Sequence, residues 1–133
     1  MAPTLPPRPT DAELTILRVL WSKGPSTVRQ VHDVLASGRE LAYTTVLKLL
    51  QIMTDKGLTT RQPLGLQHVY TACRTEQDTQ RQLVKDLLDR AFAGSTSQLV
   101  MQALATTAAS PGELREIRRL LAAAGAAGRE KKS

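Results

Sequence analysis

The chain has 133 residues, with 18 lysines and arginines against 12 aspartates and glutamates, and a formal net charge of +6 at pH 7. This length suits one ordinary domain or two small ones, and a hydrophobic share of 41% is too high for a wholly disordered protein. One cysteine and two histidines exclude an internal disulfide and a four-ligand zinc site, and no apolar run is long enough to cross a membrane. The excess of positive charge favours an acidic polymer, most often nucleic acid, as the partner.

Helical signals begin after a proline-rich start. Residues 1–9 hold four prolines and no apolar core of a signal peptide, so we expect a disordered tail there. Thr10 and Glu13 form a predicted capping box for a first helix, which Gly24 and the following proline end. Ser26 is the expected N-cap of a second helix. Residues 40–42 are expected to form a short strand before a third.

The third helix is predicted from Tyr43 to Lys56, with Gly57 as its C-terminal stop. Its apolar residues recur at the i, i+3, i+4 and i+7 spacing of a buried helix face, and they are Val46, Leu49, Leu50 and Met53. Residues 58–62 and 67–71 then change to a strand-like composition, which predicts a β-hairpin with a four-residue loop. Three helices followed by a hairpin is the element order of a winged helix-turn-helix, which we place at residues 10–73.

The side of the third helix opposite its apolar residues presents groups that can contact DNA. Hydroxyl, amide and ammonium groups can bond to phosphates or base edges, and methyl groups can pack on thymine. The residues on this side are Thr44, Thr45, Leu47, Lys48 and Gln51, with Thr54 at its margin. Arg61 in the hairpin is a candidate for a phosphate contact. Tyr43 either donates to a phosphate or is held in a stacking or buried position.

From residue 74 onward the pattern is purely helical. Thr75, Ser95 and Ser110 are expected to cap three helices, which together offer a thin apolar core. So small a unit seldom folds alone, so we expect residues 74–124 to form a dimerisation domain with a second copy of the chain. The apolar residues expected at that interface are Leu87, Leu88, Leu104, Ile117 and Leu121. Residues 125–133 are expected to be a disordered tail.

An enzymatic function is not expected, and no cofactor is implied. Cys73 and His68 lie five residues apart along a predicted strand, so their side chains would point to opposite faces. No Ser/His/Asp set or glycine-rich phosphate loop is present in the sequence. Two alternatives to DNA binding stay open: a winged helix that contacts another protein, and a small enzyme that uses Cys73.

Several segments together resemble the BlaI/MecI family of penicillinase repressors, which are bacterial transcription regulators. The matching segments are short, ordered along the chain and spread over residues 10–121, and they are TDAELTILRVLWSK, GPSTVR, AYTTV, KGL and HVY, followed by Gly94-Ser95 and Leu99-Val100. The resemblance implies a cytoplasmic homodimeric repressor with an N-terminal winged helix-turn-helix and a C-terminal helical dimerisation domain. Its expected DNA partner is an inverted-repeat operator.

The resemblance also implies a route of induction and shows two departures. In the penicillinase repressors the inducing signal comes through a membrane sensor-protease, and the repressor chain is cut between an asparagine and a phenylalanine. The matching residues here are Gln102 and Ala103. A basic residue usually follows the Thr-Val pair in the family, whereas Leu47 stands there in this chain, so the operator sequence does not transfer. Copper-responsive relatives carry a C-terminal cysteine cluster, which is absent here.

Overall fold

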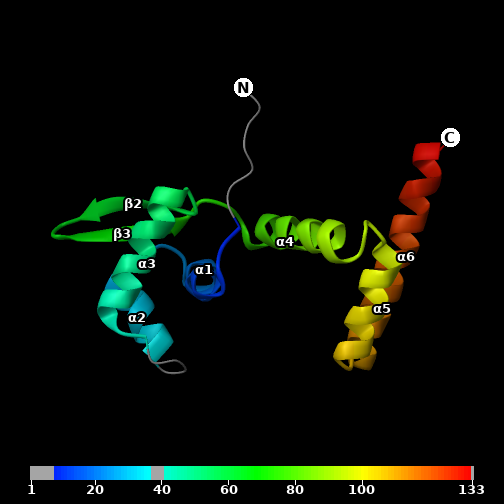
Figure 1. The fold of residues 1–133 in the computed structure, drawn as a ribbon, viewed down its shortest axis with the longest axis horizontal. Coiled ribbons are helices and arrows are strands. Elements are labelled where there is room, and N and C mark those ends of the chain that lie inside the picture. Colours follow the sequence, from blue (N-terminus) through cyan, green and yellow to red (C-terminus); the bar gives the residue numbers. More distant parts are fainter. Residues whose placement is uncertain (1–7, 37–40, 133) are drawn as a thin grey trace. The chain divides into compact units, whose positions relative to one another are not determined.

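The computed structural model describes residues 8–36 and 41–132, and the chain divides into two compact units between Asp86 and Leu87. The first unit contains three helices and three strands, which are α1 (Asp11–Lys23), β1 (Ser26–Thr27), α2 (Val28–Ala36), α3 (Tyr43–Lys56), β2 (Thr59–Leu64) and β3 (Gln67–Ala72) (Figure 1). Helix α4 (Glu76–Ala91) crosses the division, and α5 (Thr96–Thr106) and α6 (Pro111–Lys132) follow. The predicted fold class, a winged helix-turn-helix followed by helices, is confirmed.

The helix boundaries are set by the local signals expected from the sequence. Thr10 and Ser110 each form a capping box with the glutamate three residues later. Thr75 and Ser95 each accept a hydrogen bond from the backbone N–H three residues on, at 3.1 and 3.3 Å. Gly57 ends α3 in the left-handed conformation, with φ of 86°. These predicted caps are confirmed.

The start of α2 differs from the prediction by one residue. Thr27, not Ser26, is the cap: its Oγ1 accepts from the backbone N–H of Gln30, whose Oε1 accepts from the N–H of Thr27. The reason is that a capping box needs Glu or Gln three residues later, which only Thr27 has. Ser26 and Thr27 also form β1, the first strand of the sheet. Residues 41 and 42 form no strand, so the strand expected at residues 40–42 is wrong there, and residue 40 lies outside the described residues.

The sheet is antiparallel, in the order β1-β3-β2. Leu64 pairs with Gln67, so the hairpin loop is the two residues Gly65 and Leu66 and the expected four-residue loop is wrong. Gly65 has φ of 62°, as the first central residue of such a turn requires. Pro63 lies inside β2, where its missing N–H is tolerated because β2 is an edge strand.

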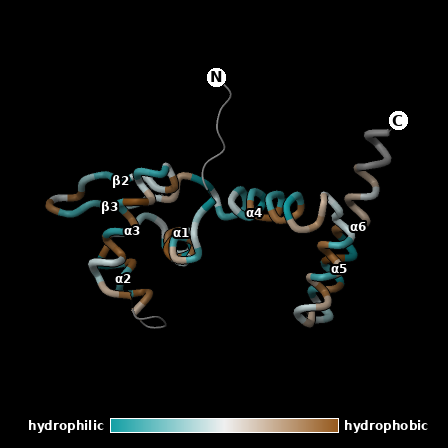
Figure 2. The backbone as a smooth tube through the Cα atoms, viewed as in Figure 1, coloured by the Kyte–Doolittle hydropathy of each residue, from teal (hydrophilic) through white to brown (hydrophobic). Residues whose placement is uncertain are grey.

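The core of the first unit lies between α1, α2, α3 and the strand β3. Hydrophobic residues recur along each helix at the spacing that turns them to this interior (Figure 2). The fully buried hydrophobic side chains are Ile16, Leu17, Val19, Leu20, Val28, Val31, Leu35, Val46, Leu50, Met53, Leu58 and Tyr70. Leu49, expected in this set, is half-buried. The apolar stripe of α3 therefore fixes which of its sides faces outward.

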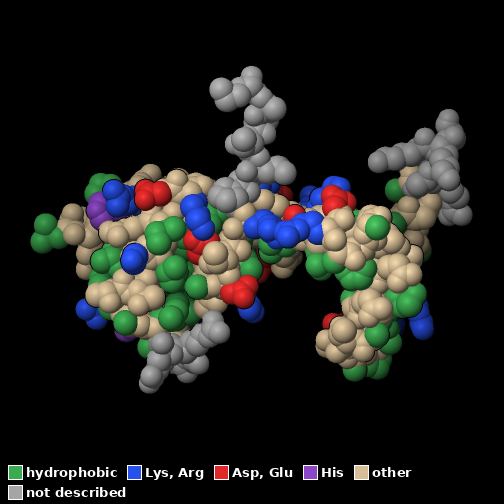
Figure 3. Space-filling model, viewed as in Figure 1, with side chains coloured by type: hydrophobic (Ala, Val, Ile, Leu, Met, Phe, Trp, Pro, Cys, Tyr) green, Lys and Arg blue, Asp and Glu red, His purple; other side chains and the backbone are tan. Residues whose placement is uncertain are grey.

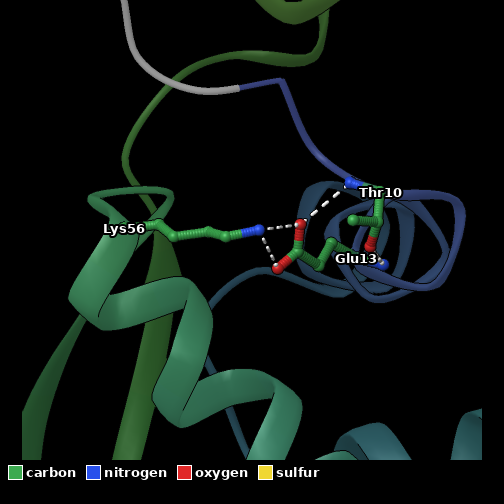
Figure 4. A network of polar contacts seen from close by, with 3 residues as sticks. All are labelled: Thr10, Glu13 and Lys56. Carbon is green, nitrogen blue, oxygen red and sulfur yellow. Dashed lines mark hydrogen bonds and ion pairs between the residues drawn. The ribbon is translucent and has the colours of Figure 1, made fainter.

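An ion pair between Glu13 and Lys56 joins the start of α1 to the end of α3 (Figure 4). The ammonium lies 3.0 Å from each carboxylate oxygen, and the carboxylate also accepts from the backbone N–H of Thr10 at 2.8 Å. Burial raises the pKa of Glu13, but the hydrogen bond from Thr10 and the bond and charge of Lys56 outweigh it and lower the pKa overall. The pair orients the end of α3 against α1.

The first unit continues beyond residue 73, where we expected the winged helix to end. The indole N–H of Trp21 donates to the carbonyl of Arg74 at 2.9 Å, and Thr79 of α4 is buried. The guanidinium of Arg8 lies 2.6 Å from the carboxylate of Asp86. Residues 1–7 of the expected tail lie outside the described residues, whereas Pro9 is buried. The first part of α4 therefore belongs with the winged helix.

The second unit leaves its hydrophobic side chains open to solvent. Within residues 87–127 no side chain is fully buried. Hydrophobic side chains, drawn in green, lie on the surface of these helices in Figure 3. The large hydrophobic residues that are exposed there are Leu87, Met101, Leu104, Leu114, Leu120 and Leu121. Helix α6 runs to Lys132, so the disordered tail expected from residue 125 is wrong as far as residue 132. The reason is that alanine, the strongest helix former, dominates residues 122–127.

Candidate nucleic-acid interface

Helix α3 turns a polar face outward. Val46, Leu50 and Met53 are fully buried on its inner side, which leaves the opposite side to solvent. The exposed residues on that side are those expected from the sequence, namely Thr44, Thr45, Lys48 and Gln51. Thr54 is an exception, because its hydroxyl donates to the carbonyl of Leu50 at 2.8 Å and lies 2.9 Å from the hydroxyl of Thr59. The outward face therefore presents two hydroxyls, an ammonium and an amide.

Tyr43 stands at the first turn of α3, where its ring contacts two side chains of α2. The guanidinium carbon of Arg29 lies 5.6 Å from the ring centroid, and the His32 ring meets it edge-on at 5.9 Å and 74°. The structure therefore shows the stacking position for Tyr43, although the residue is still 40% exposed. His32 is half-buried in this cluster.

A small pocket of about 160 Å³ opens between the start of α2, the start of α3 and strand β3. It is lined by Thr27, Val28, Arg29, Tyr43, Leu47, Leu66, Gln67, His68 and Tyr70. Leu47, expected to be exposed, is half-buried against the core and forms part of this lining. Arg29 was not among the residues expected at the site, because its position depends on Thr27 being the cap of α2.

The hairpin, which is the wing of this fold, has an apolar tip. Leu64 is 61% exposed and Leu66 is fully exposed, and hydrophobic side chains project at the end of the hairpin at the far left of Figure 3. Arg61 lies further back on β2, opposite Tyr70, and is exposed. The tip itself, residues 64–66, carries no charged side chain.

The described residues hold no group of three or more His, Cys, Asp or Glu side chains that could bind a metal ion. Cys73 is exposed just beyond the end of β3, and His68 is exposed within that strand. None of the helices in the described part of the chain combines the length and the apolar character that a membrane span requires.

Residues 9–123 match the family described as "Penicillinase repressor". The chain belongs to the penicillinase repressor family. It is 34% identical over 92 residues to the transcriptional regulator BlaI of Mycobacterium tuberculosis, a match that covers 68% of this chain and 67% of that protein. It is 24% identical over 115 residues to the penicillinase repressor of Bacillus licheniformis, covering 86% and 90% of the two chains. The family resemblance seen in the sequence is thus confirmed.

A solved structure supports the same assignment for the first unit. The solution structure of the DNA-binding domain of the repressor BlaI superimposes with a TM-score of 0.51 and 25% sequence identity, and it covers 57% of this chain and 93% of that domain. The residues that make up the winged helix here therefore have the fold of a penicillinase-repressor DNA-binding domain.

The remaining expected site residues of this chain lie in the second unit, from the end of α4 onward. Leu87, Leu104 and Leu121 are 48, 43 and 61% exposed, and Leu88 and Ile117 are half-buried. Gln102 and Ala103 are exposed within helix α5. The bond between them lies in regular helix, so a protease that needs an extended substrate would first have to open α5 locally.

Proposed function

We propose that this chain is a sequence-specific DNA-binding repressor of transcription that acts as a homodimer on an inverted-repeat operator. The observation that carries this proposal is the outward face of α3, which presents polar groups on a winged-helix scaffold. A helix of this kind fits the major groove, where base edges carry a distinct pattern for each base pair. The net charge of +6 favours the same partner.

The proposed DNA contacts are of two kinds, those to base edges and those to phosphates. In this proposal the side chains of Thr44, Thr45 and Gln51 face base edges, and Gln51 can bond an adenine with both atoms of its amide. The cationic side chains of Lys48 and Arg61 bind phosphates, which fix the orientation of the protein without reading sequence. Leu47 packs on a thymine methyl group, as its place beside the outward face allows.

The second unit supplies the dimer contact in this proposal. Its exposed leucines need a partner, because helices without a buried face are marginal in water. A second copy of the chain would cover Leu87, Leu88, Leu104, Ile117 and Leu121. Two tethered winged helices bind two half-sites far more tightly than two free ones, because the second contact becomes intramolecular.

The site of action and the signal follow from the same proposal. Operator binding places the repressor in the cytoplasm. A membrane sensor-protease, as the family resemblance implies, is the proposed source of the signal. No cofactor is required for the DNA contacts proposed here.

Selection from a pool of random-sequence duplexes with the full chain tests the proposal. We expect enrichment of an inverted repeat. Lys48 and Arg61 from two subunits would release counterions at four phosphates, which gives a logarithmic salt slope of about −3.6 and a loss of about 100-fold between 50 and 200 mM salt. A pool without enrichment, or binding that salt leaves unchanged, would refute the proposal.

One observation favours a second candidate function, a winged helix that binds another protein. The tip of the wing exposes Leu64 and Leu66 and has no cation, which suits an apolar protein surface. The same selection separates the two functions, because a protein-binding module would enrich no duplex.

A further inference from the structure

Arg29, Tyr43 and His32 form a cluster where α2 and α3 begin. The planar guanidinium of Arg29 lies over the face of the tyrosine ring at 5.6 Å from its centroid, which is within the range of a cation–π contact. His32 meets the same ring edge-on from the next turn of α2. The ring is therefore contacted by two side chains of α2.

The backbone that carries Arg29 is fixed from both sides. Arg29 is the second residue of α2 and lies within the capping box that Thr27 and Gln30 form. Thr27 in turn pairs with Val69 of β3. The start of α2 is consequently tied both to its own first turn and to the sheet, so only the side chain of Arg29 needs orienting, and Tyr43 supplies that contact.

The pocket beside this cluster has the lining that a sugar–phosphate unit requires. Its 160 Å³ far exceeds the roughly 30 Å³ that a water molecule occupies in the liquid, so it admits a group of several heavy atoms. Leu66 offers an apolar wall, and Arg29 offers a guanidinium whose N–H groups match two phosphate oxygens. An apolar wall beside a fixed cation suits a deoxyribose and its phosphate.

We propose that this pocket binds one backbone unit of the operator, with Arg29 as the phosphate ligand and Tyr43 as the positioning residue for its guanidinium. The inference rests on the DNA-binding function proposed above and adds a contact that lies off the outward face of α3. Leu66 packs on the adjacent deoxyribose in this arrangement, which gives the exposed leucine of the wing a partner. Each half-site then has one phosphate to which the guanidinium of Arg29 binds.

A scan with methylphosphonate tests the contact, since this group removes the charge of one phosphate at a time. The probe is the duplex that the full wild-type chain enriches, and the affinity is measured by fluorescence anisotropy. We expect one position in each half-site where neutralisation weakens wild-type binding about tenfold but changes the binding of Arg29→Ala less than about twofold. Arg29→Ala itself should lose about tenfold on the unmodified duplex.

A matched control is Arg18→Ala, which removes the same charge from an exposed position on α1, where the side chain lies beside Trp21 and Glu76. Tyr43→Ala should lose part of the affinity that Arg29→Ala loses, and Tyr43→Phe, which keeps the ring, should restore most of it. Circular dichroism establishes that each variant is folded.

Three results would overturn the inference. The first is an Arg29→Ala affinity equal to that of Arg18→Ala. The second is a methylphosphonate profile that Arg29→Ala leaves unchanged at every position. The third is an equal loss for Tyr43→Phe and Tyr43→Ala, which would assign the contact to the hydroxyl. A wild-type chain that enriches no duplex overturns both proposals, whereas one that binds DNA without regard to Arg29 overturns this one alone.

Discussion

The ion pair between Glu13 and Lys56 gives the sharpest prediction for stability. Lys56→Met removes the charge and keeps most of the length of the side chain. It leaves a carboxylate that is 2% exposed, with Thr10 as its remaining hydrogen-bond partner through the backbone N–H and the side chain. An uncompensated buried charge is strongly unfavourable, so the folded state should lose stability.

The magnitude follows from the burial of the two partners. Removing one member of a fully buried pair costs about 3–5 kcal/mol, but Lys56 is 33% exposed and Glu13 keeps its hydrogen bonding to Thr10. We therefore expect Lys56→Met to lower the free energy of unfolding by about 2 kcal/mol. Glu13→Gln should cost only about 1 kcal/mol, because the amide oxygen still accepts from Thr10 and Lys56 can turn to water.

The contribution of the Glu13–Lys56 pair to stability should fall as the pH is lowered. The pKa of Glu13 is lowered in the folded state, so its stabilising contribution is complete above the unfolded value of about 4.3 and is lost as the pH falls through the folded pKa. Lys56→Met removes the hydrogen bond and the charge of Lys56, which are two of the causes that lower this pKa, while the burial that raises it remains, so Glu13 takes up a proton at a higher pH. The difference in stability between wild type and variant should therefore shrink between pH 7 and about pH 4.

Urea unfolding of the full chain, at one fixed protein concentration, measures this difference in the free energy of unfolding. The fluorescence of Trp21, the single tryptophan, reports on the unit that contains the pair. Lys48→Met is the matched control, because it removes an exposed lysine from the same helix and should change stability by less than about 0.5 kcal/mol. A Lys56→Met variant as stable as this control at pH 7, or a difference that acid leaves unchanged, would refute the reasoning.

Four further expectations concern the DNA contact, the dimer, a glycine and induction. Lys48→Ala should weaken binding to every duplex and reduce the salt slope by about 1 per subunit, whereas Gln51→Ala should relax the preference at one or two base pairs by about 1–3 kcal/mol; competition titrations that show the same change for both would contradict this. Leu121→Asp should yield monomers in sedimentation with a folded winged helix, because it places a carboxylate in an apolar interface; a stable dimer would contradict it. Gly57→Ala should lower the unfolding free energy by about 1 kcal/mol in urea titrations, since φ is 86° although the added Cβ meets nothing within 4 Å; unchanged stability would count against that strain. Mass spectrometry of the chain from induced cells should find a break at Gln102–Ala103 if the family route operates, and an intact chain throughout derepression would exclude it.

Helix positions could be predicted because their signals are local. The capping boxes at Thr10 and Ser110 and the stop at Gly57 depend only on residues within one turn. The short strands could not be predicted in the same way. β1 is a strand because Ser26 and Thr27 pair with residues of β3 more than forty positions away, and no pattern within a two-residue segment indicates that partner.

The residues of the candidate site also divide into those that local spacing predicts and those that depend on packing between elements. The outward residues of α3 could be predicted because its apolar spacing fixes the side that is buried, which leaves Lys48 and Gln51 exposed. Arg29 could not be predicted, because its contact with Tyr43 depends on the exact start of α2 and on the packing of that helix against α3. Leu47 was misjudged for a related reason, since it is half-buried by packing against the core beside the wing.

Strand β1 pairs with β3 of the wing and passes directly into α2, without an intervening loop. The wing and the helix-turn-helix are thereby joined by backbone hydrogen bonds, so the span between the wing and α3 is largely fixed. A duplex that touches both must adopt the groove width and curvature that this span imposes. The energy of bending DNA depends on its base steps, and pyrimidine–purine steps deform most easily. The operator preference of this repressor should therefore extend to base pairs that no side chain reaches, through the local stiffness of the duplex.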